Sequence, residues 1–156
     1  MANPTSVIDD ATFSVRRTIH IAAPIEKVWE AITEPALISR WFGRADFPST
    51  KVGANGTLSW DDYGSIPVRI EAIDAPRSIT YRWSNDDALG KLPAVVDDGD
   101  STVFTFTLDT EDDGTRLSVV ETGFETTSDP VANLESHRGG WDSELDELVD
   151  LLESAA

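Results

Sequence analysis

Cysteine is absent from the 156 residues of this sequence. Its absence excludes disulfide bonds, thiolate metal sites and cysteine nucleophiles. Histidine is nearly absent too: His20 and His137 lie far apart, and neither belongs to a histidine–carboxylate cluster with metal-ligand spacing. No phosphate-binding loop or dinucleotide fingerprint occurs either. We therefore expect no metal site and no cofactor.

Positive charge is scarce. Lysine and arginine together number 12, against 29 aspartates and glutamates, which gives a formal net charge of −17. Such a surface repels phosphate backbones and anionic lipids, so nucleic-acid and membrane partners are not expected. The acidity has two interpretations, solubility in a salty cytoplasm where salt screens the self-repulsion, or recognition of a basic partner, and we favour the first.

Long apolar runs are also missing. No stretch approaches the roughly 20 apolar residues of a membrane span, and residues 1–14 lack the basic and apolar regions of a signal peptide. The chain is still 40% hydrophobic and 8% aromatic, enough for one ordinary core. We expect a cytoplasmic protein with a flexible tail over residues 1–11 and a single domain over residues 12–156.

Hydrophobic periodicity predicts the elements in order. Apolar residues alternate over residues 13–21, which predicts a strand. Residues 24–33 have helical spacing after Pro24, and a second short helix is predicted over residues 36–41. Alternation and intervening turns predict five further strands, over residues 56–60, 66–71, 78–83, 103–108 and 115–121. The acidic connection over residues 85–100 is long, and its apolar middle favours a flap over a disordered loop.

A long final helix is predicted from the cap Ser128-Asp129-Pro130 to about residue 153. Residues spaced by three and four define its buried stripe: Val131, Leu134, Arg138, Trp141, Leu145, Leu148 and Leu152. The predicted fold class is α+β, a curved antiparallel sheet of about six strands around this helix, with two short helices after the first strand. A curved sheet around one cylinder leaves space between the two, so we expect a cavity.

The sequences RTIHIAAPIEKVWEAITEP at residues 17–35 and LISRWFG at residues 37–43 closely resemble the opening of a known family. That family is the activator of heat-shock-protein-ninety ATPase homologue-like family of the START-like, or SRPBCC, superfamily. Later segments agree in order, at residues 79–83, 101–106, 115–124 and 137–141. The resemblance covers about residues 13–153 and implies a helix-grip fold. It implies no single function, because the superfamily includes lipid carriers, polyketide cyclases, hormone receptors and chaperone cofactors.

Large aromatic side chains are the first candidates for the cavity lining. Eight are candidates: Trp41, Phe42, Trp60, Tyr81, Trp83, Phe104, Phe106 and Trp141. Ordinary core packing is the competing interpretation, since aromatics fill cores. We favour lining for Trp41, Phe42 and Trp83, and the resemblance implies that the first two rim the cavity mouth.

Polar residues on apolar faces are the second group of candidates. Arg17, Glu121 and Arg138 have inward positions, where a charge without a partner costs several kcal/mol. We expect pairing with each other or with water ahead of ligand contact. His137, one step off the helix stripe, could form a hydrogen bond at the cavity end. The glycines at 139 and 140 each cost the helix about 1 kcal/mol relative to alanine, which a close strand or room for a ligand would explain.

The leading functional hypothesis is non-catalytic binding of a small hydrophobic molecule in the cavity, as a carrier, sensor or stress-related protein. No catalytic motif is present, so no catalytic residue is assigned. One alternative is a co-chaperone-like activator of a heat-shock ATPase. Another is a polyketide cyclase-like or hydrolase-like enzyme with Glu121, His137 or Arg138 as acid, base or oxyanion stabiliser. The protein would be a monomer or a homodimer.

Overall fold

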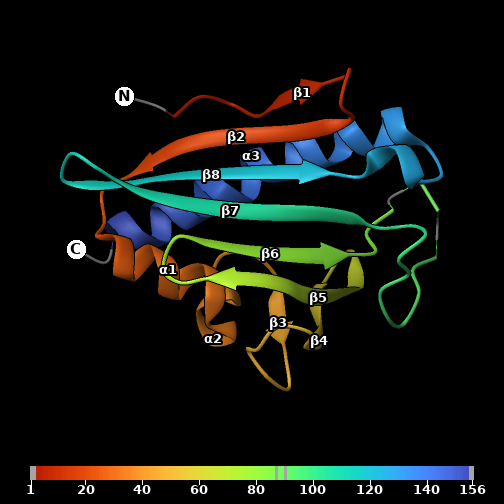
Figure 1. The fold of residues 1–156 in the computed structure, drawn as a ribbon, viewed down its shortest axis with the longest axis horizontal. Coiled ribbons are helices and arrows are strands. Elements are labelled where there is room, and N and C mark those ends of the chain that lie inside the picture. The colour runs from red at the N-terminus through yellow and green to blue at the C-terminus, as the bar shows by residue number, and fades with distance from the viewer. Residues whose placement is uncertain (1–2, 87, 90, 155–156) are drawn as a thin grey trace.

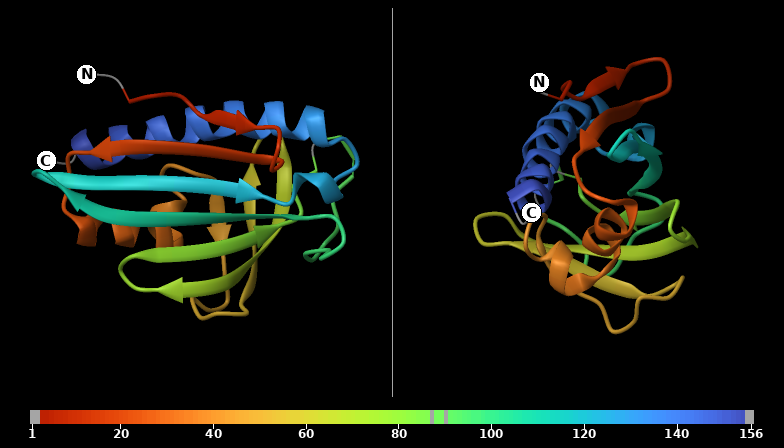
Figure 2. Two further views of the ribbon diagram at one scale, coloured as in Figure 1. Left: turned by 45° about the horizontal axis from the view of Figure 1, so that its top comes forward. Right: turned by 90° about the vertical axis from the view of Figure 1, so that its left-hand side faces the viewer.

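An antiparallel sheet bends around one long helix, α3 (Pro130–Ser154), as Figures 1 and 2 show. The computed structural model describes residues 3–86, 88, 89 and 91–154. Over these residues the sheet has eight strands in the order β1-β2-β8-β7-β6-β5-β4-β3. Their bounds are β1 Val7–Asp9, β2 Ser14–Ile21, β3 Arg44–Asp46, β4 Asn55–Trp60, β5 Gly64–Asp74, β6 Ser78–Trp83, β7 Thr102–Glu111 and β8 Gly114–Thr122.

The α+β helix-grip arrangement predicted from the sequence is confirmed, with eight strands over the described residues in place of about six. The two additional strands, β1 and β3, are three residues each, too short for a period of two to be visible. β1 lies inside the segment predicted as a flexible tail and pairs with β2 through Val7 and Arg16. Residues 7–9 therefore form an edge strand of the sheet.

Alternation along the central strands orients their apolar side chains toward α3. On β6 the buried residues are Ile79, Tyr81 and Trp83, as the sequence pattern predicts. On β7, Phe104 and Phe106 are 1% exposed, and on β8 the same face carries Leu117 and Val119. These side chains and the buried stripe of α3 form one core, in which burial of apolar area is the main stabilising term.

The short helices α1 (Ile25–Thr33) and α2 (Pro35–Ile38) lie near the C-terminal end of α3 (Figure 1). α2 ends earlier than the predicted residue 41. Trp41, beyond its end, is 2% exposed, and its indole donates a 2.7 Å hydrogen bond to the Ala31 carbonyl. The Tyr81 hydroxyl donates to the Ile32 carbonyl at the same distance. These two bonds fix α1 and the segment after α2 to the core.

The buried stripe of α3 differs from the predicted one at two positions. Val131 is 71% exposed, and Arg138 points away from the core, with its guanidinium 3.0 Å from Glu135. His137 takes the inward place instead, three residues after Leu134 and four before Trp141, and is 5% exposed. The inward face of α3 therefore carries the imidazole ring of His137 where the sequence pattern predicts the arginine side chain of residue 138.

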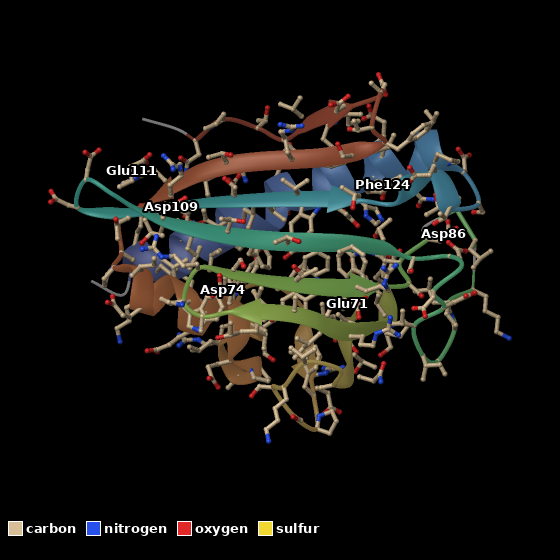
Figure 3. The ribbon with its side chains drawn as sticks, viewed as in Figure 1. Glu71, Asp74, Asp86, Asp109, Glu111 and Phe124 are labelled. Carbon is tan, nitrogen blue, oxygen red and sulfur yellow. The ribbon has the colours of Figure 1, made fainter. Side chains whose placement is uncertain are left out.

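The described residues of the connection 85–100 are held at both ends. Asp86, at the end of the molecule where Phe124 also lies (Figure 3), accepts hydrogen bonds from Ser128 and from the Asn133 amide at the start of α3. At the other end, Asp98 binds Arg69 of β5 at 2.7 Å. The predicted flap is thus attached to both the sheet and the helix, while residues 87 and 90 lie outside the described residues.

Arg17 of β2 joins three distant segments. Its guanidinium donates to the Pro4 carbonyl at 2.8 Å and to the Asp142 carbonyl at 3.1 Å, and binds the Asp146 carboxylate at 2.7 Å. The residue is 3% exposed, so its charge depends on these partners. The expectation that Arg17 and Glu121 could pair with each other is wrong, because each has its own set of partners.

Arg17→Ala should lower the free energy of unfolding by about 3 kcal/mol, because it leaves buried acceptors without donors. The matched control is Arg16→Ala on the same strand, whose side chain is 57% exposed and lies 3.7 Å from Asp9. Exposed pairs contribute little, so the control should change stability by less than about 1 kcal/mol. Urea titrations at pH 7 measure both, and equal losses would contradict the role assigned to Arg17.

Candidate functional site

A pocket of about 250 Å³ lies between the N-terminal half of α3 and strands β4 to β6. Aromatic side chains form most of its wall, and polar groups lie among them. The lining residues are Phe42, Trp60, Asp62, Tyr63, Ile66, Trp83, Asn85, Ser136, His137, Gly140, Trp141 and Glu144. A space between sheet and helix, expected from the curvature, is therefore present along part of α3.

Beside α1 and α2 the interior is nearly filled. The space among Trp41, Tyr81, Phe104 and Phe106 is only about 10 Å³, less than one water needs comfortably. Tyr81 and Phe104 stack with ring centroids 5.3 Å apart, and Phe106 meets Trp41 edge to face at 6.3 Å. For these four aromatics, ordinary core packing describes the structure, and cavity lining does not.

Phe42 is the centre of the aromatic wall. Its ring centroid lies 5.5 Å from that of Trp60, 5.8 Å from Trp83 and 5.6 Å from Trp141. Edge-to-face and tilted pairs at such distances each add about 0.5–1.5 kcal/mol beyond area burial. The wall is therefore built by mutual packing of rings from a loop, two strands and α3, and needs no ligand to hold its shape.

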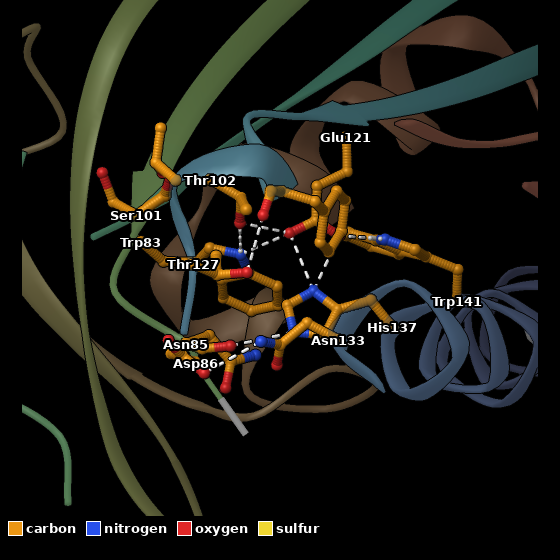
Figure 4. A network of polar contacts seen from close by, with 12 residues as sticks. Trp83, Asn85, Asp86, Ser101, Thr102, Glu121, Thr127, Asn133, His137 and Trp141 are labelled. Carbon is orange, nitrogen blue, oxygen red and sulfur yellow. Dashed lines mark hydrogen bonds and ion pairs between the residues drawn. The ribbon is translucent and has the colours of Figure 1, made fainter. Parts of the chain in front are cut away.

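A fully buried carboxylate lies behind this wall. Glu121 of β8 is 0% exposed and accepts hydrogen bonds from the indoles of Trp83 and Trp141 at 2.8 and 2.9 Å (Figure 4). The Thr102 hydroxyl donates to the same carboxylate. His137 approaches it through Nδ1 at 2.9 Å. The two tryptophans that form part of the pocket wall are thus oriented by one acid.

Both ring nitrogens of His137 face acceptors. Nδ1 faces the Glu121 carboxylate, and Nε2 lies 2.9 Å from the Asn85 carbonyl oxygen. A neutral imidazole carries one N–H, so it would leave one of these contacts without a hydrogen. The doubly protonated ring satisfies both, and makes Glu121–His137 a buried ion pair.

The environment of Glu121 shifts its pKa in opposing directions. Burial alone raises the pKa, because it disfavours the charged form. The charge of His137, together with hydrogen bonds from His137, Thr102 and Trp83, outweighs burial and holds the pKa below its ordinary value. Glu121 is therefore an ionised, fully partnered group at neutral pH.

Glu144 is the contrasting carboxyl. It lies on α3 one turn after Gly140 and is half-buried in the pocket wall. Burial and the nearby charge of Glu147 raise its pKa to about 7, and a hydrogen bond from Trp60 acts in the opposite direction. Because its pKa lies near neutrality, this carboxyl changes its charge in the physiological range.

The two glycines of α3 are explained by space and not by close packing. A Cβ atom at either position would meet nothing within 4 Å. Both glycines are exposed, but Gly140 lines the pocket and Gly139 does not. The interpretation that a strand approaches the helix closely here is therefore wrong, and a side chain at 140 would occupy the pocket.

The sequence-predicted site residues divide into four groups, one of which fills the core beside α1 and α2: Trp41, Tyr81, Phe104 and Phe106. Five line the pocket: Phe42, Trp60, Trp83, His137 and Trp141. Glu121 supports the wall from behind, and Arg17 and Arg138 bind acidic groups elsewhere. Sequence reasoning did not select seven other lining residues, which are Asp62, Tyr63, Ile66, Asn85, Ser136, Gly140 and Glu144. Glu144 had a detectable signal, since it lies one position before Leu145 of the apolar stripe.

One known family matches most of the chain. The family model described as Activator of Hsp90 ATPase homolog 1-like protein matches residues 22–153. The chain belongs to this family. None of the curated proteins matches it. The family resemblance noted in the sequence is therefore confirmed over most of the chain.

Solved structures support the same fold. Protein MLL2253 from Mesorhizobium loti is 28% identical, with a TM-score of 0.76 over 92% of this chain and 98% of that one. DynU16, a protein of the dynemicin biosynthetic locus, is 24% identical with a TM-score of 0.74, over 91% of this chain and 48% of its own. The Aha1 dimer from Colwellia psychrerythraea is 19% identical with a TM-score of 0.69, over 90% and 96%. The last two likenesses concern the fold alone.

Membrane-spanning helices and clusters of metal-binding side chains are both absent among the residues that the structure describes. Among them, no helix has both the length and the apolarity needed to span a membrane. Within the same residues, no three His, Asp or Glu side chains gather in a way that could hold a metal ion.

Glu121→Gln should lower the free energy of unfolding at pH 7 by about 3 kcal/mol, because it leaves the His137 charge buried without its counter-charge. The matched control is Glu111→Gln, which breaks a carboxylate–histidine pair with His20 of similar length, 3.0 Å, at the half-exposed surface. The control should lose less than about 1 kcal/mol.

The same pair predicts a pH dependence. Because the folded-state pKa of Glu121 is lowered, its stabilisation is present above the unfolded value of about 4.3 and is lost as the pH falls through the folded value. The gap between the wild type and Glu121→Gln should not narrow from pH 7 to pH 5, and it should narrow below about pH 4. Denaturant titrations followed by circular dichroism measure it, and a gap that narrows between pH 7 and pH 5 would contradict the assignment.

Proposed function

We propose that this protein binds a small, largely apolar molecule in the pocket on α3, without catalysing its conversion. The observation that carries this proposal is the aromatic wall around about 250 Å³ of space, with a glycine, Gly140, on the helix side. Apolar pockets with a few polar groups are the usual form of small-molecule sites. A carrier, sensor or stress-related role in the cytoplasm is consistent with such a site.

The size and shape of the pocket favour a compact ring system. Ligand sites commonly measure about 300–1,000 Å³, so this one is at the small end. Phe42, Trp83 and Trp141 pack on one another with ring centroids 5.6 to 6.0 Å apart, and a wall built of such rings suits a flat aromatic molecule. A molecule of one or two fused rings fits this description better than a long acyl chain does.

The buried polar pair favours binding over catalysis. Glu121 is inaccessible and receives hydrogen bonds from Thr102, His137 and both neighbouring indoles. Both ring nitrogens of His137 are engaged, and Arg138 points away from the pocket. A general acid or base must reach the proton that it transfers. The cyclase-like or hydrolase-like alternative therefore has little support from these three residues.

A co-chaperone role is the second candidate, and the family description favours it. The structural likeness to the Aha1 dimer from Colwellia psychrerythraea adds the possibility of a homodimer. An ATPase assay with a bacterial Hsp90 tests this role directly. Stimulation that survives blocking of the pocket would favour the co-chaperone, and no stimulation together with ligand binding would favour the binding protein.

Two glycine variants, which differ only in the position of the introduced leucine, test whether the pocket is the binding site. Gly140→Leu places a side chain in the pocket, whereas Gly139→Leu places the same side chain in solvent one residue earlier. Both should gain roughly 1 kcal/mol of helix propensity relative to glycine. The fluorescence of the neutral probe N-phenyl-1-naphthylamine should increase on binding to the wild type and to Gly139→Leu. The affinity of Gly140→Leu for the same probe should be at least about tenfold lower.

Both variants must first show wild-type circular dichroism and cooperative unfolding, which removes misfolding as an explanation. Equal probe affinity of the two leucine variants would overturn the pocket as the binding site. A lack of probe binding by the wild type would count against the proposed function, because an open aromatic pocket should accept a neutral aromatic molecule of this size.

A further inference from the structure

The charged residues that line the pocket are unbalanced. Two carboxyls, Asp62 and Glu144, belong to the lining, and no lysine or arginine occurs among the described lining residues. The single basic residue, His137, is already paired with Glu121. The electrostatic potential inside is therefore negative, in agreement with a chain whose formal net charge is −17.

Aromatic faces add to this preference. Phe42, Trp60, Tyr63, Trp83 and Trp141 surround the same space. The face of each ring carries negative quadrupole charge and attracts a cation, most strongly in tryptophan. Such a contact contributes about 0.5–1 kcal/mol at exposed sites and about 2 kcal/mol where water is excluded. Several tryptophans that lie beside carboxyl groups are a typical environment for an organic cation.

Glu144 lies where it can act as the counter-charge. Its carboxyl is half-buried in the wall, and the indole of Trp60 is the donor that stabilises its ionised form. An ionised carboxylate accepts up to about four hydrogen bonds, so it has capacity for a ligand ammonium group. Asp62, an exposed lining residue in the turn after β4, adds a second negative charge.

We propose that the pocket selects a small aromatic cation, such as an arylalkyl ammonium ion, with the rings holding its body and Glu144 its charge. This inference rests on the proposed function and names the chemical class of the ligand. The closest competing class is a neutral ring molecule of the same shape, which the rings alone would bind. An anionic ligand would meet repulsion from Asp62 and Glu144.

Three probes of one shape test the selectivity: 1-naphthylmethylammonium, 1-naphthalenemethanol and 1-naphthoate, which carry charges of +1, 0 and −1. Calorimetric titration of the wild type at pH 8 should give an affinity for the cation at least about tenfold above that for the alcohol, equivalent to about 1.4 kcal/mol, with the anion weakest. Alcohol binding equal to or tighter than cation binding would overturn the inference and leave the proposed function intact.

Two variants that remove the same charge test whether Glu144 causes the preference for the cation. Glu144→Gln and Asp150→Asn each remove one negative charge from α3, but Asp150 is exposed and does not line the pocket. Glu144→Gln should lose most of the preference for the cation over the alcohol, while Asp150→Asn should keep it. Equal effects of the two variants would assign the preference to the general charge of the protein and overturn the role of Glu144.

The affinity for the cation should also depend on pH. Glu147 on the same helix and Trp60 on β4 act on Glu144, and Asp62 and His137 are the other ionisable groups of the pocket lining. Its pKa of about 7 means that the carboxyl is mostly protonated at pH 6 and ionised at pH 8. An alkylammonium ion, like lysine, stays charged in this range. Cation affinity should rise several-fold from pH 6 to pH 8, and the alcohol affinity should not change.

Two further outcomes would overturn parts of this proposal. A cation affinity that is flat with pH in the wild type and in Glu144→Gln would overturn the counter-charge role. Binding of none of the three naphthyl probes would overturn the selectivity for aromatic cations, and the glycine variants with the neutral probe would then decide the proposed function separately.

Discussion

The buried carboxylate of Glu121 is the constraint on which the site depends. An ionised acid removed from water costs several kcal/mol unless every lone pair has a donor. Here the donors come from β6, β7 and α3, so the sheet and the helix must meet at one fixed distance and register. Trp83 and Trp141 cannot rotate into the neighbouring space without losing their bonds to this acid. The open pocket and the buried ion pair are therefore two consequences of one arrangement.

A division of roles between two carboxyls follows from their surroundings. Glu121 has a buried counter-charge and four kinds of donor, which favour its ionised form strongly enough to overcome burial. Burial and the nearby charge of Glu147 raise the pKa of Glu144, and the hydrogen bond from Trp60 does not offset them, so its ionised form is disfavoured. The first group therefore orients the wall, and the second remains available to a ligand. Groups of the same chemistry acquire different roles because their partners differ.

Most of the fold could be predicted from the sequence, because long elements repeat their pattern. The alternation in β6 and the spacing of Leu134, Trp141, Leu145 and Leu148 identified the sheet face and the helix face. Short elements gave no such signal, which is why β1 and β3 were missed. On α3 the prediction placed Arg138 inward, whereas His137 points inward. Neither side chain is apolar, so hydropathy could not decide between them.

The site was harder to predict because it depends on contacts between distant segments. Aromatic residues are equally consistent with core and lining, and only packing separates Phe42 from Phe106. Polar lining residues such as Asn85 enter through a backbone carbonyl, which no side-chain pattern reveals. Gly140 was the informative exception, because a glycine inside a helix is costly enough to require a reason.

The surface charge and the pocket charge have the same sign but respond differently to salt. Exposed carboxylates act over long range and are screened within about 8 Å at physiological ionic strength. Glu144 is half-buried. In the proposed complex it would act at contact distance on the ligand, where salt screens less. Attraction of a cation toward the protein would therefore decline with salt, whereas the preference for a cation once inside would persist. We therefore propose different roles for the two sets of acids, solubility for the acidic exterior and cation binding for the acid within the aromatic wall.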